Sequence, residues 1–160
     1  MKTITIVFSK PQNMKLPIGS WIIRKWMKTD YSHVSVHFFS QSLDRHLIYE
    51  AVGSGVRFVG KDLWDKHAVA VYSTELNVTE EQYVKVLQRC VDLAGIKYGL
   101  TQNIGICIAK ILKLIKNPFK SAKSEENCSE IAAEVLTILG ISFDKHLDLI
   151  TPKDIFDKLN

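Results

Sequence analysis

Cysteine is scarce in this sequence, and the cysteines do not form pairs. Three occur in 160 residues, Cys90, Cys107 and Cys128, widely spaced and without a CxxC motif. Disulfide frameworks and structural zinc sites need paired cysteines, so we expect a reducing compartment, no metal and no cofactor. A zinc site built from His33, His37 and a cysteine is the one metal alternative that the ligand types offer.

Long apolar runs are also absent. No stretch approaches the ~20 apolar residues that span a bilayer. The first residues alternate like a strand, with Ile4, Ile6 and Phe8, instead of forming a signal peptide. The sequence therefore predicts a cytoplasmic protein without a transmembrane segment. Its hydrophobic fraction of 46% and charged fraction of 24% are those of a soluble globular chain, and residues 1–160 fit a single domain.

Clustered positive charge is confined to one segment. The net charge is +4, and the lysines are spread along the chain except in Lys110–Lys123. Nucleic-acid binding needs a denser patch with Arg or aromatic residues, so no nucleic acid is expected. The segment Ile104–Lys123 also carries an isoleucine stripe, which is typical of a membrane-surface helix or of an ordinary core helix with a solvated face. Together with the helix that contains Trp21 and Trp26, this segment allows three further interpretations: peripheral membrane contact, a lipid-like substrate, or a lid over the cleft.

A thiol at the start of a helix is the most informative feature. The sequence Asn-Cys-Ser-Glu at residues 127–130 opens an apolar helical series. Asn127 is a good N-cap and Glu130 occupies the capping-box position, so Cys128 is expected on the first turn. The helix macrodipole and the free N–H groups there favour the nucleophilic thiolate. A buried structural cysteine, as expected for the other two, is the alternative.

A base and a carboxylate lie on two strands upstream. Residues 31–39 and 47–52 are typical of an antiparallel hairpin. His33 and His37 share one face; in one register Glu50 lies diagonally from His33, about 7–8 Å away, and a slip of one residue reverses it. A nucleophilic thiol needs an imidazole base, and that base needs an orienting group. His37 is the rival base, and a satisfied structural histidine is the alternative role for His33.

The remaining patterns complete an α+β prediction, an antiparallel sheet of about five strands packed against helices. Thr79 and Thr151 each begin a predicted helix as its cap. The predicted strands are 3–8, 31–39, 47–52, 56–59 and 69–72, and the predicted helices are 18–28, 80–94, 104–116, 128–139 and one beginning at Pro152.

The order of three short motifs adds a family resemblance. The motifs are Ser32-His33-Val34, Tyr49-Glu50-Ala51 and Asn127-Cys128-Ser129-Glu130, with shorter matches at residues 53–56, 97–99 and 151–154. Together they resemble the circularly permuted papain-like superfamily, which includes NlpC-type amidases and peptidases, YiiX-like hydrolases and lecithin:retinol acyltransferase-like proteins. In unpermuted members Cys precedes His, whereas here His33 precedes Cys128. The resemblance covers most of the chain.

The resemblance implies a papain-like (permuted NlpC-type) fold with a catalytic cysteine at a helix N-terminus. It implies a triad in which Cys128 is the nucleophile, His33 the base and Glu50 the orienting residue. The implied function is hydrolysis or acyl transfer at an amide or ester, with a peptide or cell-wall amide first among the substrates. The alternative is a non-catalytic module that attaches to membrane or nucleic acid through Lys110–Lys123.

The resemblance also implies an oxyanion hole and substrate cleft near the thiol, formed by Tyr98, Asn127 and Ser129. About thirty residues separate Tyr98 from Cys128, whereas the corresponding motifs of NlpC-type members lie close together. The backbone N–H of Cys128 is the firmer oxyanion donor, because amides at a helix start have no partner within the helix.

Overall fold

The structure, a computed structural model, describes residues 1–12, 18–98 and 125–160. The elements in chain order are β1 (Lys2–Pro11), α1 (Ile18–Met27), β2 (His33–Ser40), β3 (Arg45–Val52), β4 (Gly55–Gly60), α2 (Lys61–Trp64), β5 (Ala68–Val78), α3 (Glu80–Leu93), β6 (Lys97–Tyr98), β7 (Glu125–Glu126), α5 (Cys128–Ile138), the 3-10 helix η1 (Leu147–Leu149) and α6 (Pro152–Leu159). Among the described residues, no helix has the length and apolar character needed to cross a bilayer.

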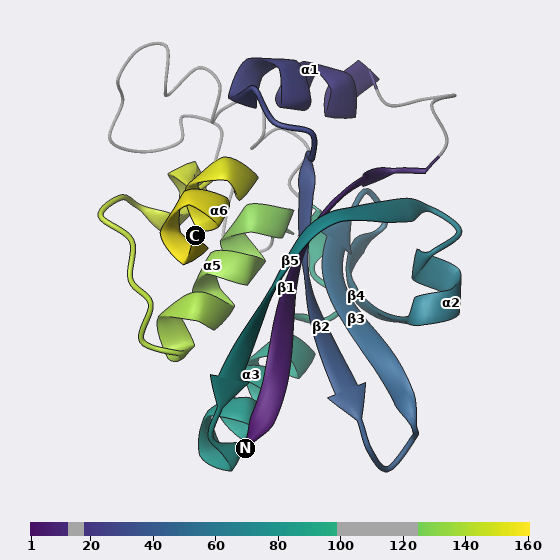
Figure 1. Ribbon diagram of the computed structural model, residues 1–160, viewed down its shortest axis with the longest axis vertical. Helices are drawn as coiled ribbons and strands as arrows, with labels where there is room; N and C mark the ends of the chain where they lie inside the picture. Colours follow the sequence, from purple (N-terminus) through teal and green to yellow (C-terminus); the bar gives the residue numbers. More distant parts are fainter. Residues whose placement is uncertain (13–17, 99–124) are drawn as a thin grey trace.

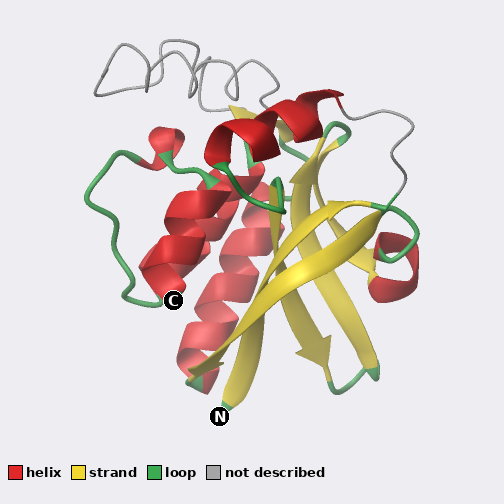
Figure 2. Ribbon diagram, turned by 45° about the horizontal axis from the view of Figure 1, so that its top comes forward, coloured by secondary structure: helices red, strands yellow, loops and turns green. Residues whose placement is uncertain are grey.

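The centre of the fold is a five-stranded sheet in the order β4-β3-β2-β1-β5, and every neighbouring pair is antiparallel. Helices α3, α5 and α6 lie together on one side of this sheet, and the short α2 lies on the other (Figures 1 and 2). The α+β class and the antiparallel five-stranded sheet predicted from the sequence are confirmed.

Alternate residues in the middle of β1 and β2 build the main core. These apolar side chains face the helices and are buried, while the side chains between them face the other side of the sheet. The side chains of α5 that follow the helical apolar series fill the space against them. The buried residues that share this cluster include Ile4, Ile6, Phe8, Val34, Val36, Phe38, Ile131, Val135 and Leu136.

The opposite face of the sheet combines a small apolar cluster with buried polar groups. Val7, Ile48 and Trp64 form the cluster under α2. Ser35 and Glu50, on the same face of the hairpin, are 0% and 4% exposed. Buried polar groups need partners, so this face is where a specific polar arrangement is expected.

The far edge of the sheet differs from the prediction. The sequence predicts a strand only at residues 69–72 here, whereas β5 pairs with β1 along its whole length, from Lys2↔Val78 to Pro11↔Ala68. β5 is an edge strand, and most of its side chains are exposed. An exposed strand does not need a regular series of apolar residues, so the sequence pattern that marks its ends is weak. The predicted helix 104–116 and the Lys110–Lys123 segment lie outside the described residues.

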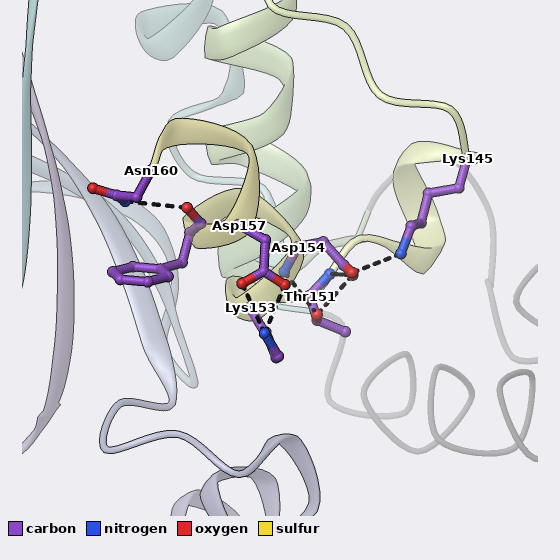
Figure 3. A network of polar contacts seen from close by, with 7 residues as sticks. Lys145, Thr151, Lys153, Asp154, Asp157 and Asn160 are labelled. Carbon is purple, nitrogen blue, oxygen red and sulfur yellow. Dashed lines mark hydrogen bonds and ion pairs between the residues drawn. The ribbon is translucent and has the colours of Figure 1, made fainter.

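The end of the chain is fixed by a capped helix, α6. The predicted cap is confirmed: the N–H of Asp154 donates to Thr151 Oγ1, and the Thr151 N–H donates to the Asp154 carboxylate. Lys145 adds an ion pair to Asp154 at 2.7 Å (Figure 3). Ile150 and Ile155, on either side of the cap, are fully buried. This hydrophobic staple packs α6 against the main core.

Candidate active site

The hairpin of β2 and β3 brings an imidazole to a carboxylate. Val36 pairs with Tyr49, so Glu50, the next residue of β3, comes opposite Ser35 and shares a face with His33. The ring atom Nε2 of His33 lies 3.3 Å from Oε2 of Glu50. The contact is an ion pair between an imidazole that is 19% exposed and a carboxylate that is 5% exposed.

A residue of a third strand, β4, also contacts the carboxylate of Glu50. Arg57 of β4 lies directly across from Glu50. Its Nε and Nη2 donate to Oε1 of Glu50 at 3.1 and 2.8 Å, which leaves Oε2 for His33. Burial raises the pKa of Glu50, but the contacts with His33 and Arg57 outweigh it and lower the pKa. Arg57 belongs to none of the sequence motifs, because only the register of β4 against β3 places it beside Glu50.

The first turn of α5 delivers the thiol. Asn127 is the N-cap, and its Oδ1 accepts the N–H groups of Ser129 and Glu130 at 2.9 Å each. Cys128 is therefore the first helical residue, and it is 5% exposed. Its N–H has no acceptor within the helix, as for every residue at this position.

Three groups contact the sulfur of Cys128. The imidazole of His33, the backbone N–H of Val34 and the hydroxyl of Ser129 all hydrogen-bond to it. Because Nε2 of His33 faces Glu50, the other ring nitrogen, Nδ1, is left for the thiol. Cys128, His33, Glu50 and Arg57 thus form a continuous chain of contacts that joins α5 to three adjacent strands.

The electrostatics of this chain favour a thiolate and an imidazolium. Burial lowers the pKa of His33, but the charges of Cys128 and Glu50 and the hydrogen bonds to both raise it to about 10. Burial raises the pKa of Cys128, but the charge of His33 and the hydrogen bonds at the sulfur outweigh burial. The net effect is a pKa below the ordinary value of a thiol. The arrangement can therefore supply a nucleophile and a proton donor at the same time.

The other histidine on the same face of β2 has a different environment. Nε2 of His37 lies 3.0 Å from Ser35 Oγ, and the ring of Trp64 packs edge-on at 5.0 Å between centroids. Burial is the main cause that lowers the pKa of His37 to about 4. Of the two candidate bases, the imidazole that contacts Cys128 is that of His33.

Tyr98 and Cys128 are far apart in the sequence, but strand pairing brings their backbone segments together. β6 and β7 are parallel, and Tyr98 pairs with Glu126, which precedes the cap residue Asn127. Gly55 lets the chain approach β4 here: its φ is +118°, and a Cβ would lie 2.9 Å from the carbonyl oxygen of Ile96. The backbone of Tyr98 therefore runs beside the segment that leads into Cys128.

The polar residues of the site are engaged with one another. Within residues 1–12, 18–98 and 125–160, no group of three or more His, Cys, Asp or Glu side chains is arranged to hold a metal ion. Cys128, His33 and Glu50 are instead engaged with one another, and the cation of Arg57 sits on the carboxylate. A guanidinium in that place disfavours a second cation.

The comparisons with known proteins show the fold. Neither a scan against protein-family models nor a search of curated proteins gives a match. Among solved structures, the chain is similar to the metalloprotein YiiX from Escherichia coli O157:H7, of the domain family DUF1105. The TM-score is 0.64 and the identity 18%, and the match covers 98% of this chain and 92% of YiiX. The chain therefore has a YiiX-like fold over almost its whole length.

Proposed function

We propose that this chain is a papain-like thiol hydrolase or acyl transferase, with Cys128 as nucleophile, His33 as general acid and base, and Glu50 as the residue that orients His33. The observation that carries the proposal is the thiol–imidazole–carboxylate chain, in which His33 contacts both Cys128 and Glu50. The YiiX-like fold supports it, and so does the resemblance of the motifs to the permuted papain-like superfamily.

The first half of the reaction forms a thioester. The thiolate of Cys128 attacks the carbonyl carbon of an amide or ester, a C–S bond forms, and the π electrons move to the carbonyl oxygen. The backbone N–H of Cys128 points from the helix start and donates to this oxyanion. When the intermediate collapses, the C–N or C–O bond breaks and the imidazolium of His33 gives its proton to the leaving amine or alcohol.

The second half releases the acyl group. Neutral His33 takes a proton from water or another acceptor, which attacks the thioester carbonyl. The C–S bond then breaks, the acid or the new acyl product leaves, and the site returns to thiolate and imidazolium. Glu50 stabilises the imidazolium and fixes the ring orientation through each proton transfer.

The substrate class in this proposal is an acyl compound with an amide or ester bond, and a peptide or cell-wall amide is the first candidate. Tyr98 borders the site through its pairing with Glu126, and Ser129 supports the thiolate. YiiX is described as a metalloprotein, but in this chain Cys128, His33 and Glu50 contact one another and the guanidinium of Arg57 sits on the carboxylate. The steps above use only the side chains and backbone of the chain.

A trapped acyl-enzyme tests the proposal. The wild-type protein is mixed with p-nitrophenyl acetate and its mass is followed, with peptide mapping of the modified residue. We expect a burst of nitrophenol and one acetyl group on Cys128. Both should be lost in Cys128→Ser and retained in the matched control Cys90→Ser, because Cys90 is buried in the main core. An unmodified Cys128, or equal acetylation in Cys128→Ser, contradicts the proposed function.

A further inference from the structure

Helix α1 buries Met27 but leaves two large apolar side chains on its outer face. Trp21 and Ile22 are 54% and 49% exposed, whereas Nε of Arg24, on the inner side of the same helix, is buried. A helix that only packs on a core does the reverse, with apolar side chains inward and charged ones in water. The outer face of α1 therefore carries apolar area that the described fold does not use.

The charged side chains of α1 itself, and of Lys28 directly after it, are all basic. Residues 18–28 contain Arg24, Lys25 and Lys28 and no acidic residue. Nζ of Lys25 lies 4.9 Å from the centre of the Trp21 ring, so the cation and the indole share one surface. Tryptophan beside flexible lysines is the combination that suits a boundary between lipid and water, because the ring enters the interface while the ammonium stays at the headgroups.

The same helix borders the candidate active site. It lies across the end of the sheet at which β2 begins (Figures 1 and 2). The hydroxyls of Ser20 and Ser32 are 2.6 Å apart, and Ser32 immediately precedes His33. Whatever binds the outer face of α1 is therefore held close to the Cys128–His33 pair.

We propose that Trp21, Ile22 and Lys25 dock α1 onto an anionic lipid membrane, and that docking presents the site to acyl compounds held at that surface. Charge complementarity favours this partner, because every charged side chain of the helix is basic. A stable protein interface buries about 800 Å² on each partner, more than two half-exposed side chains supply. The presentation of acyl substrate rests on the proposed function, whereas the docking itself does not.

Vesicle co-sedimentation tests the docking. The wild-type protein is compared on vesicles of phosphatidylcholine alone and of an equal mixture with phosphatidylglycerol. We expect binding to the anionic vesicles that weakens as salt screens the charges. Trp21→Ser/Ile22→Ser should lower the affinity roughly tenfold or more, and Lys25→Glu should lower it on anionic vesicles alone. Leu43→Ser is the matched control, because Leu43 is 59% exposed but lies outside α1.

The outcomes separate the two proposals. Cys128→Ser should bind the vesicles like the wild type, so loss of thioester formation with retained binding overturns only the proposed enzymatic function. Equal binding by the wild type and Trp21→Ser/Ile22→Ser overturns the docking, as does a failure of the wild type to bind anionic vesicles. Self-association that disappears in the double variant assigns the surface to a second copy and also overturns the docking on lipid.

Discussion

Glu50 divides its two oxygens between two partners. Oε1 accepts both hydrogen bonds from Arg57, and Oε2 faces the imidazole of His33. The carboxylate is 5% exposed while Arg57 is 38% exposed, so the guanidinium supplies positive charge to a group that water hardly reaches. This bidentate contact fixes the orientation of the carboxylate and keeps it ionised. We therefore assign Arg57 as a positioning residue that acts through Glu50.

Removing the guanidinium tests this assignment through the pH dependence of ester turnover. Arg57 lowers the pKa of Glu50, so Arg57→Met should raise that pKa and move the acid limb of kcat/KM to higher pH. The loss of rate should be smaller than the roughly 10²–10⁴-fold expected for removing the base His33. Arg57→Lys retains the charge and should leave the acid limb nearly in place. An acid limb that does not move in Arg57→Met contradicts the assignment.

At the scale of elements, the cap of α5 connects stability with reactivity. Asn127 is completely buried, and its amide oxygen accepts the N–H groups of Ser129 and Glu130. The same cap holds Cys128 at the position where it meets His33. α3 provides an independent cap for comparison, since Thr79 forms a capping box with Gln82 on the exposed surface.

The two caps make a matched pair of substitutions. Asn127→Ala and Thr79→Ala should each cost about 1 kcal/mol of folding free energy, or about 2–4 °C in Tm for a domain of this size. Only Asn127→Ala should also slow alkylation of Cys128 below neutral pH, because the first turn then no longer holds the thiol against His33. Thermal unfolding and alkylation rates on both variants give the comparison. Equal alkylation rates of Cys128 in Asn127→Ala and Thr79→Ala would contradict the claim that the cap of α5 supports the reactivity of the thiol.

The extent to which sequence predicts these elements follows the range of the interactions. The caps at Thr79, Asn127 and Thr151 depend on neighbouring residues, so local patterns located them. The short pair β6–β7 joins segments far apart in the chain, and no local pattern encodes it. Arg57 was missed for the same reason, since its role depends on the register of a third strand.

At the scale of the whole molecule, the fold assembles one site from distant segments and gives two cysteines opposite properties. Cys90, on the buried face of α3, is 1% exposed, and burial raises the pKa of its thiol. Cys128 is buried to a similar extent, but His33 lowers its pKa. Burial alone therefore does not determine reactivity; the charged partner does.

This contrast predicts selective labelling of the native protein. In a Cys107→Ser background, a limiting amount of iodoacetamide at neutral pH should modify Cys128 and leave Cys90 free. Cys90 should react only after unfolding in denaturant, when its thiol enters water and its pKa returns to the ordinary value. Peptide mapping before and after unfolding measures both sites. Comparable labelling of Cys90 in the native state contradicts the account of burial.

The most direct test of the central claim is the alkylation rate of Cys128 as a function of pH, in the wild type and in His33→Ala, with the other two cysteines replaced by serine. The wild type should react as a thiolate well below the ordinary thiol pKa of about 8.5. His33→Ala removes the charge that lowers the pKa of Cys128, so its rate should rise only at higher pH. A Cys128 that stays unreactive, or whose pH profile is the same in His33→Ala, contradicts the thiolate–imidazolium pair and the function built on it.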